Sequence, residues 1–63
     1  MAFYWVYESA EDKRLGHSEP FDSRSDAETW IGAEFNLLLD EQVDQVRLFE
    51  DETEIFGPMS LHP

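Results

Sequence analysis

The sequence predicts an α+β fold of order ββαββ, in which one amphipathic helix packs on one face of a four-stranded sheet. Four short runs rich in aromatic and β-branched residues indicate strands, and a longer central run has apolar residues at helical spacing. Charged segments and segments with Gly or Pro separate these runs. A chain of 63 residues is expected to form a single small domain, 1–63.

Two strands are expected before the helix. Residues 3–8 (FYWVYE) have the aromatic and β-branched composition that suits a half-buried pleated surface. The polar residues 11–14 turn the chain, and residues 15–18 return as a short second strand. Pro20 cannot donate a ladder hydrogen bond, so this strand is expected to stop before it. The two strands together form a predicted hairpin.

The central helix is expected to run from about Asp26 to about Glu41. Ser25 and Glu28 have the spacing of a capping box, in which each side chain accepts from the other residue's backbone N–H. Apolar residues recur at about 100° per residue and gather on one arc of the helix. The arc consists of Ala27, Trp30, Ile31, Phe35, Leu37 and Leu38.

Two residues interrupt the helical pattern. Gly32 costs roughly 1 kcal/mol relative to alanine inside a helix, and we interpret it as a tolerated residue rather than a mark of close packing. Glu34 falls within the apolar arc, and its carboxylate is expected to reach solvent along a sheet edge. The predicted core also includes part of the fourth strand, and its main members are Val6, Leu15, Trp30, Ile31, Phe35, Leu38, Val46 and Leu48.

Two further strands are expected after the helix. Residues 45–49 (QVRLF) alternate and predict a third strand, the charged residues 50–53 predict a turn, and residues 54–56 predict a fourth strand. Gly57 and Pro58 are expected to end this strand. From about residue 59 the chain is expected to be an irregular tail.

Three segments resemble those of a known group of proteins. They are residues 21–23 (FDS), residues 27–32 (AETWIG) and residues 56–61 (FGPMSL). Together with the aromatic first strand, they resemble a group of small acidic, uncharacterised actinobacterial proteins of about this length. The resemblance covers nearly the whole chain and implies the ββαββ fold and a cytoplasmic location. It implies no activity, cofactor or catalytic residue.

An aromatic patch is predicted on the sheet face that the helix leaves uncovered. Side chains alternate along a strand, and the aliphatic Val6, Val46 and Leu48 suit the helix-facing side. This assignment leaves aromatic and arginine side chains, the types enriched at protein interfaces, on the open face. The candidate interface is Phe3, Trp5, Tyr7, Arg47 and Phe49. The same pattern allows the alternative that Trp5 faces the helix, or that the tail covers the open face.

Acidic residues dominate the second half of the chain. The candidate acidic surface is Asp40, Glu41, Asp44, Glu50, Asp51, Glu52 and Glu54. Such a surface keeps a protein in solution and discourages strand pairing at sheet edges. A functional interpretation is that it attracts basic partners. A sharper form of this hypothesis is a mimic of DNA charge that inhibits a DNA-binding protein.

Composition argues against several function classes. Four Lys and Arg residues against 15 acids give a net charge of −11, which argues against binding to nucleic acid or to an anionic membrane surface. The chain has no cysteine, and His17 and His62 lack metal-ligand spacing. Catalytic motifs and nucleotide-binding loops are absent from the sequence. We therefore expect no enzyme activity, no cofactor and no metal.

Location and partners follow from the same features. No apolar run reaches the roughly 18 residues of a transmembrane helix, and the N-terminal segment lacks the pattern of a signal peptide. These features predict a cytoplasmic protein. The leading hypothesis is a non-catalytic protein–protein interaction module that binds a protein partner or forms a homodimer, and the alternative is the DNA mimic.

Overall fold

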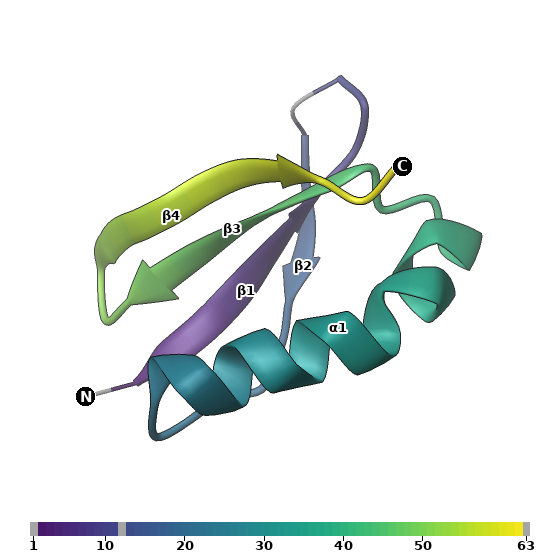
Figure 1. The fold of residues 1–63 in the computed structure, drawn as a ribbon. Coiled ribbons are helices and arrows are strands. Elements are labelled where there is room, and N and C mark those ends of the chain that lie inside the picture. Colours follow the sequence, from purple (N-terminus) through teal and green to yellow (C-terminus); the bar gives the residue numbers. More distant parts are fainter. Residues whose placement is uncertain (1, 12, 63) are drawn as a thin grey trace.

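A computed structural model describes residues 2–11 and 13–62 and confirms the ββαββ order (Figure 1). Strands β1 (Phe3–Glu8) and β2 (Arg14–His17) precede the helix α1 (Arg24–Asp40). Strands β3 (Gln45–Glu50) and β4 (Thr53–Ser60) follow it. The elements fall where the hydrophobic pattern changes period, as expected from the sequence.

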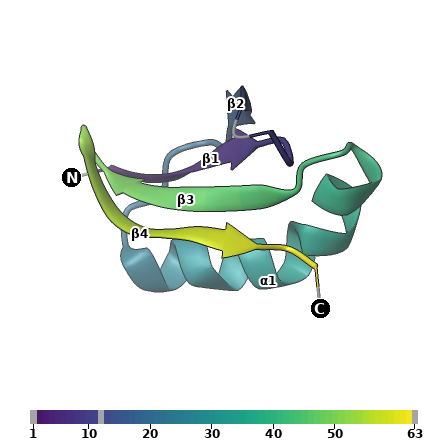
Figure 2. The same cartoon turned by 90° about the horizontal axis from the view of Figure 1, so that it is seen from above.

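The four strands form one open antiparallel sheet in the order β2-β1-β3-β4. The first and third strands are therefore central neighbours, and β2 and β4 are the edge strands. Figure 2, seen from above, shows α1 lying on one side of the sheet, while the opposite side carries no helix. The fold thus has one covered face and one open face.

The register of β1 against β3 shows which side chains face the helix. Trp5 lies opposite Leu48 and Tyr7 lies opposite Val46, and directly opposed residues share a face. Trp5 is only 1% exposed, and its indole Nε1 donates a hydrogen bond of 2.8 Å to the carbonyl of Ala27 in α1. This bond ties the centre of the sheet to the helix.

The core therefore differs in part from the predicted one. Ile31, Leu38, Val46 and Leu48 are buried as expected, and Trp30 packs against them while half-buried. Leu15 and Phe35 were expected in the core but are 51% and 38% exposed. Trp5 lies in the core, as in the alternative in which it faces the helix, and the core residues that the sequence pattern missed are Ala27, Val43 and Leu61.

The helix begins two residues before its predicted start. Ser23 is the N-cap, and its hydroxyl accepts a hydrogen bond of 3.1 Å from the N–H of Asp26. The predicted cap, Ser25, lies within the first turn. An N-cap residue has an extended backbone, and serine is favoured there. Ser23 and Ser25 both precede the apolar run, so the sequence alone did not determine which of them starts the helix. Gly32 has open space where a Cβ would stand, which confirms that it marks no close packing.

The helix ends in a Schellman motif. Gln42 has a φ of 69°, and its N–H donates to the carbonyl of Leu39, while the N–H of Val43 donates to the carbonyl of Leu38. Val43 and Leu38 are both buried in the core. This apolar contact between the two ends of the motif brings the chain back toward the sheet at β3.

Strand β4 is longer than predicted, because Gly57 and Pro58 do not end it. Val46 lies opposite Met59 and Leu48 lies opposite Phe56, which leaves Gly57 and Pro58 together opposite a single residue in a bulge. Gly57 has a φ of 119°, and a Cβ there would lie 3.0 Å from the Arg47 Cα. Glycine at this position therefore allows β4 to approach β3 closely.

Residues 59–61 also belong to the fold, contrary to the predicted irregular tail. Met59 and Ser60 complete β4, and Leu61 is buried in the core. The N–H of Leu61 donates to the carbonyl of Asp44 at 3.0 Å. The end of the chain thereby covers the start of β3 on the helix side of the sheet.

Candidate functional site

The open face of the sheet carries a different set of residues from the predicted patch. Arg47 and Phe49 lie on it as expected, but Phe3, Trp5 and Tyr7 lie on the helix side, so their assignment to the open face was wrong. The physical reason is that the aromatic side chains of β1 have more apolar area to bury against α1 than Val6 has. The open-face residues of the two central strands are Tyr4, Val6, Glu8, Gln45, Arg47 and Phe49.

Aromatic rings cover one end of the open face. Tyr4 lies opposite Phe49, and their rings stack with centroids 5.6 Å apart and planes 14° apart. The His17 ring meets Tyr4 edge-on at 6.1 Å. Val6 is only 4% exposed although no helix covers it. Its cross-strand neighbours on this face are His17 and Arg47, so we infer that side chains of the sheet itself cover it.

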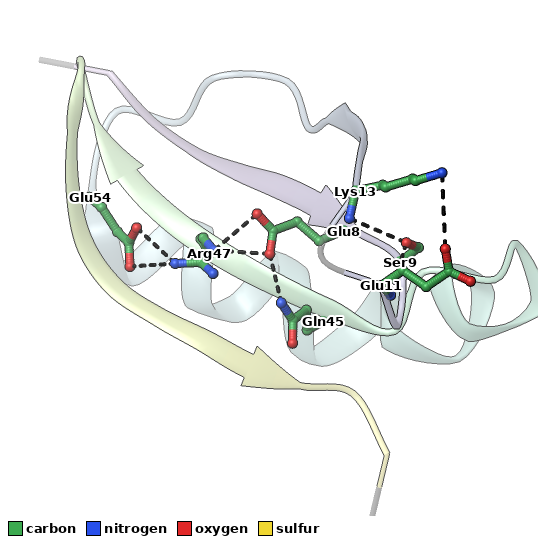
Figure 3. Close-up of polar contacts among 7 residues, drawn as sticks. All are labelled: Glu8, Ser9, Glu11, Lys13, Gln45, Arg47 and Glu54. Carbon is green, nitrogen blue, oxygen red and sulfur yellow. Dashed lines mark hydrogen bonds and ion pairs between the residues drawn. The ribbon is translucent and has the colours of Figure 1, made fainter.

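Polar side chains lie beside these rings on the open face and join three strands (Figure 3). Arg47 lies between two carboxylates: its Nε donates to both oxygens of Glu8 at 2.9 and 3.0 Å, and its Nη1 donates to Glu54 at 3.1 and 3.3 Å. Gln45 adds a hydrogen bond of 2.7 Å to Glu8. The guanidinium thereby links β1 to β4 across β3.

This network stabilises the charged forms of Glu8 and Arg47. Burial raises the pKa of Glu8, but the hydrogen bonds from Arg47 and Gln45 and the charge of Arg47 outweigh it, so the pKa lies below its ordinary value. The hydrogen bonds that Arg47 donates to Glu8 and Glu54 raise the pKa of Arg47. The ion pairs therefore persist at neutral pH, and the network acts as a brace between strands.

On the helix side, the phenol of Tyr7 stays neutral to higher pH. Burial raises the pKa of Tyr7, and the negative charges of Glu41, Glu34 and Glu19 raise it further. Its ring stacks on that of Trp30, with centroids 6.4 Å apart. Glu34 itself is half-buried, so the helix does not expose its carboxylate completely.

The seven predicted acids fall into groups rather than on one surface. Three lie where α1 ends and β3 begins: Asp40, Glu41 and Asp44. Three lie at the β3–β4 turn at the far end of the same strand: Glu50, Asp51 and Glu52. The seventh, Glu54, is paired with Arg47 on the open face. Two of the others also have partners, because Asp44 contacts His62 and Asp51 accepts from the N–H of Ala2.

Three cavities lie around β2 and the neighbouring turns. One of about 460 Å³ lies between the β1–β2 turn and residues 42–44. One of about 340 Å³ borders β2 on the helix side, next to Tyr7 and Val43. One of about 290 Å³ borders β2 on the open side, next to Tyr4 and Pro20. In the described residues every buried polar side-chain atom has a hydrogen-bond partner.

Sequence reasoning missed four residues of the open face, namely Tyr4, Glu8, His17 and Glu54, as parts of one site. Strand alternation was a sufficient signal to group Tyr4 with Glu8, because they share a side of β1. The strand order was needed to place His17 and Glu54 beside them. This order brings β1 and β3, which are 37 or more residues apart, into contact.

Comparison with protein-family models, with curated proteins and with solved structures found no match for this chain. Across residues 2–11 and 13–62, no helix has the length and apolar character needed to cross a membrane. Within the same residues, no three His, Asp or Glu side chains lie together in a way that could hold a metal ion.

Proposed function

We propose that this chain is a non-catalytic interaction module that forms a homodimer through the open face of its sheet. The observation that carries the proposal is the stacked pair of Tyr4 and Phe49, which lies on a sheet face without a covering layer. Aromatic side chains and arginine are the residue types that contribute most to the stability of protein interfaces.

The charge distribution supports a second copy as the occupant. The open face carries Glu8 and Glu54 against Arg47 and Arg14, so 2 − 2 = 0, whereas the whole chain carries −11. Two copies repel each other least when their charge-balanced faces meet, since the remaining acids then lie at the periphery. Charge balance at the face thus favours self-association over other orientations.

The size of the chain supports the same occupant. A standard interface buries about 800 Å² per partner, and the whole molecule exposes 4154 Å². A dimer would therefore use about one fifth of the surface, the scale of one face of this sheet. Domains of fewer than about 70 residues without disulfides or metals are marginally stable, and dimerisation is one way in which they gain buried apolar area.

Light scattering on a sizing column tests the proposal, because it gives absolute mass independently of charge. We expect a dimer whose dissociation constant falls as sodium chloride is raised, since salt screens the repulsion between two chains of −11. Phe49→Ser should shift the equilibrium toward monomer by tenfold or more, on the order of the loss of one buried aromatic anchor.

Phe35→Ser is the matched control, because Phe35 is also a partly exposed phenylalanine but lies on α1. This variant should keep the wild-type dimer. A wild-type chain that stays monomeric at every concentration and salt would overturn the proposal, as would equal dimerisation of the Phe49→Ser variant.

A further inference from the structure

The free edge of β2 has the features of a second binding site. β2 pairs with β1 alone, and in the described residues no other segment forms a backbone hydrogen bond with residues 14–17. The opposite edge strand, β4, contains Pro58, which hinders further strand pairing. β2 contains no proline, so its edge is the one open to an added strand.

The hydrogen bonds at the end of β2 show which backbone groups face outward. The N–H of Ser18 donates to the carbonyl of Trp5 at 2.8 Å, and the N–H of Trp5 donates to Ser18 Oγ at 2.9 Å. Inward-bonded and outward-directed pairs alternate along an antiparallel ladder. His17 precedes Ser18 and lies opposite Val6. Its N–H and carbonyl therefore point to the free edge.

Cavities lie on both sides of this edge. The register shift between Tyr7 and Glu8 leaves Leu15 as an extra residue in β2, so that Arg14 lies opposite Glu8 on the open side. The open-side cavity of about 290 Å³ is lined by Tyr4, Arg14, His17, Ser18 and Pro20. The helix-side cavity of about 340 Å³ is lined by Tyr7, Leu15, Gly16, His17, Glu41 and Val43. A strand added to β2 would alternate its side chains between these two cavities.

Arg14 indicates the chemistry of the occupant. The other Lys and Arg residues each pair with carboxylates, as Lys13 does with Glu11 and Arg24 does with Glu28. In residues 2–11 and 13–62, Arg14 has no ion pair, although the chain has 15 acids. A carboxylate from a partner complements this guanidinium. On the other side, the 51% exposed Leu15 suits an apolar side chain.

We propose that β2 binds an extended segment of a partner polypeptide as a fifth strand of the sheet. A glutamate of this segment lies opposite His17, exchanges both backbone hydrogen bonds with it, and places its carboxylate near Arg14. The apolar residues before and after that glutamate enter the helix-side cavity beside Leu15. This site adjoins the homodimer face proposed above at Tyr4 and Arg14, but strand addition at the β2 edge does not depend on the dimer.

A fluorescent synthetic peptide with the order Thr-Val-Glu-Val-Thr, capped at both ends, tests the proposal against the full chain by fluorescence anisotropy. His17→Pro removes the outward N–H of β2 but leaves the inward pairing with β1 intact, and it should weaken binding about tenfold or more. His17→Ala is the matched control, because it keeps the N–H, and it should bind within about threefold of wild type. Circular dichroism verifies that both variants are folded.

Two further measurements test the backbone and the charge separately. The first changes only the peptide, and the second reverses the charge of Arg14 in the protein. N-methylation of the peptide's glutamate removes its donor and should weaken binding as His17→Pro does. Arg14→Glu should reverse the charge preference, so that a second peptide with the order Thr-Val-Lys-Val-Thr binds this variant more tightly than the glutamate peptide does. Wild-type binding weaker than about 1 mM, or equal binding of the N-methylated peptide, would overturn the proposal.

The test also distinguishes this site from the homodimer face. Because the His17 ring borders the homodimer face at Tyr4, His17→Pro is compared with His17→Ala, and the two variants should have the same molar mass. If His17→Pro is monomeric where His17→Ala is dimeric, the occupant of the β2 edge is a second copy of the chain, and the peptide proposal is wrong.

Discussion

The two faces of the sheet bury their residues by different means. On the helix face, Trp5 and Leu48 lose nearly all contact with water because α1 lies over them. On the open face, Val6 is almost as buried, but only neighbouring side chains of the sheet enclose it. The comparison shows that a sheet face without a covering layer can still exclude water locally, through stacked rings and a braced arginine.

The difference affects how each face responds to change. The helix face is packed by rigid elements, so the loss of a side chain leaves a cavity that the backbone cannot fill. The open face is covered by side chains alone, and a ring such as that of Tyr4 can move into a gap or admit water. Removing an equal volume should therefore cost more on the helix face.

The largest effect is expected from Trp5→Ala. Removing this buried ring should lower the free energy of unfolding by about 3–5 kcal/mol, and it also removes the hydrogen bond to Ala27. Phe49→Ala on the open face should cost about 1 kcal/mol, the scale of one aromatic pair. Urea unfolding followed by circular dichroism measures both, and equal losses would contradict the distinction between the faces.

Two valines allow a matched comparison of intermediate size. Val46→Ala and Val6→Ala remove the same atoms from residues that are 0% and 4% exposed. We expect a loss of about 2–3 kcal/mol for Val46, which lies in the core cluster, and about 1 kcal/mol for Val6. The same unfolding measurement applies. A larger loss for Val6 would mean that the open face is the more rigidly packed one.

At high pH, the helix face should weaken first. The pKa of Tyr7 is raised by burial and by nearby carboxylates, so the unfolded chain releases the phenol proton at lower pH than the folded chain does. Stability should therefore fall as pH rises above the ordinary value of 10.0. Thermal unfolding of Tyr7→Phe should show less of this loss, while Tyr4→Phe, which keeps Tyr7, should retain it.

At low pH, the open face should contribute a smaller loss. The pKa of Glu8 lies below its ordinary value of 4.5 because Arg47 and Gln45 outweigh the effect of burial. Its stabilising contribution is complete above 4.5 and is lost as pH falls through the lowered pKa. The stability difference between wild type and Glu8→Gln should therefore shrink below pH 4.5. Glu52→Gln, which removes an equal charge from the β3–β4 turn, should not show this change.

Particular residues show how far the sequence could predict this molecule. Helical spacing located α1 to within about two residues, because a long amphipathic segment gives a strong periodic signal. Gly57 and Pro58 gave a false end to β4, since a bulge on an edge strand accommodates both residues. No local signal distinguishes such a bulge from a strand end.

The candidate site was only half predictable. Arg47 and Phe49 were identified on the open face, because their aliphatic neighbours on β3 suited the helix side. On β1 the same reasoning failed, since both sides of that strand carry aromatic residues and either set could face the helix. The binding edge at β2 was not predicted, because it depends on strand order and on a bulge at Leu15.

The sequence by itself determined the order of the elements and the two sets of side chains on each strand, because both follow from local periodicity. Only the tertiary structure decided which set of β1 lies under α1. That choice depends on which rings fill the space beneath the helix, and there Trp5 also finds a hydrogen-bond acceptor at Ala27. The tertiary structure likewise placed Arg47 between Glu8 and Glu54, since three strands distant in sequence must meet before their charges can pair.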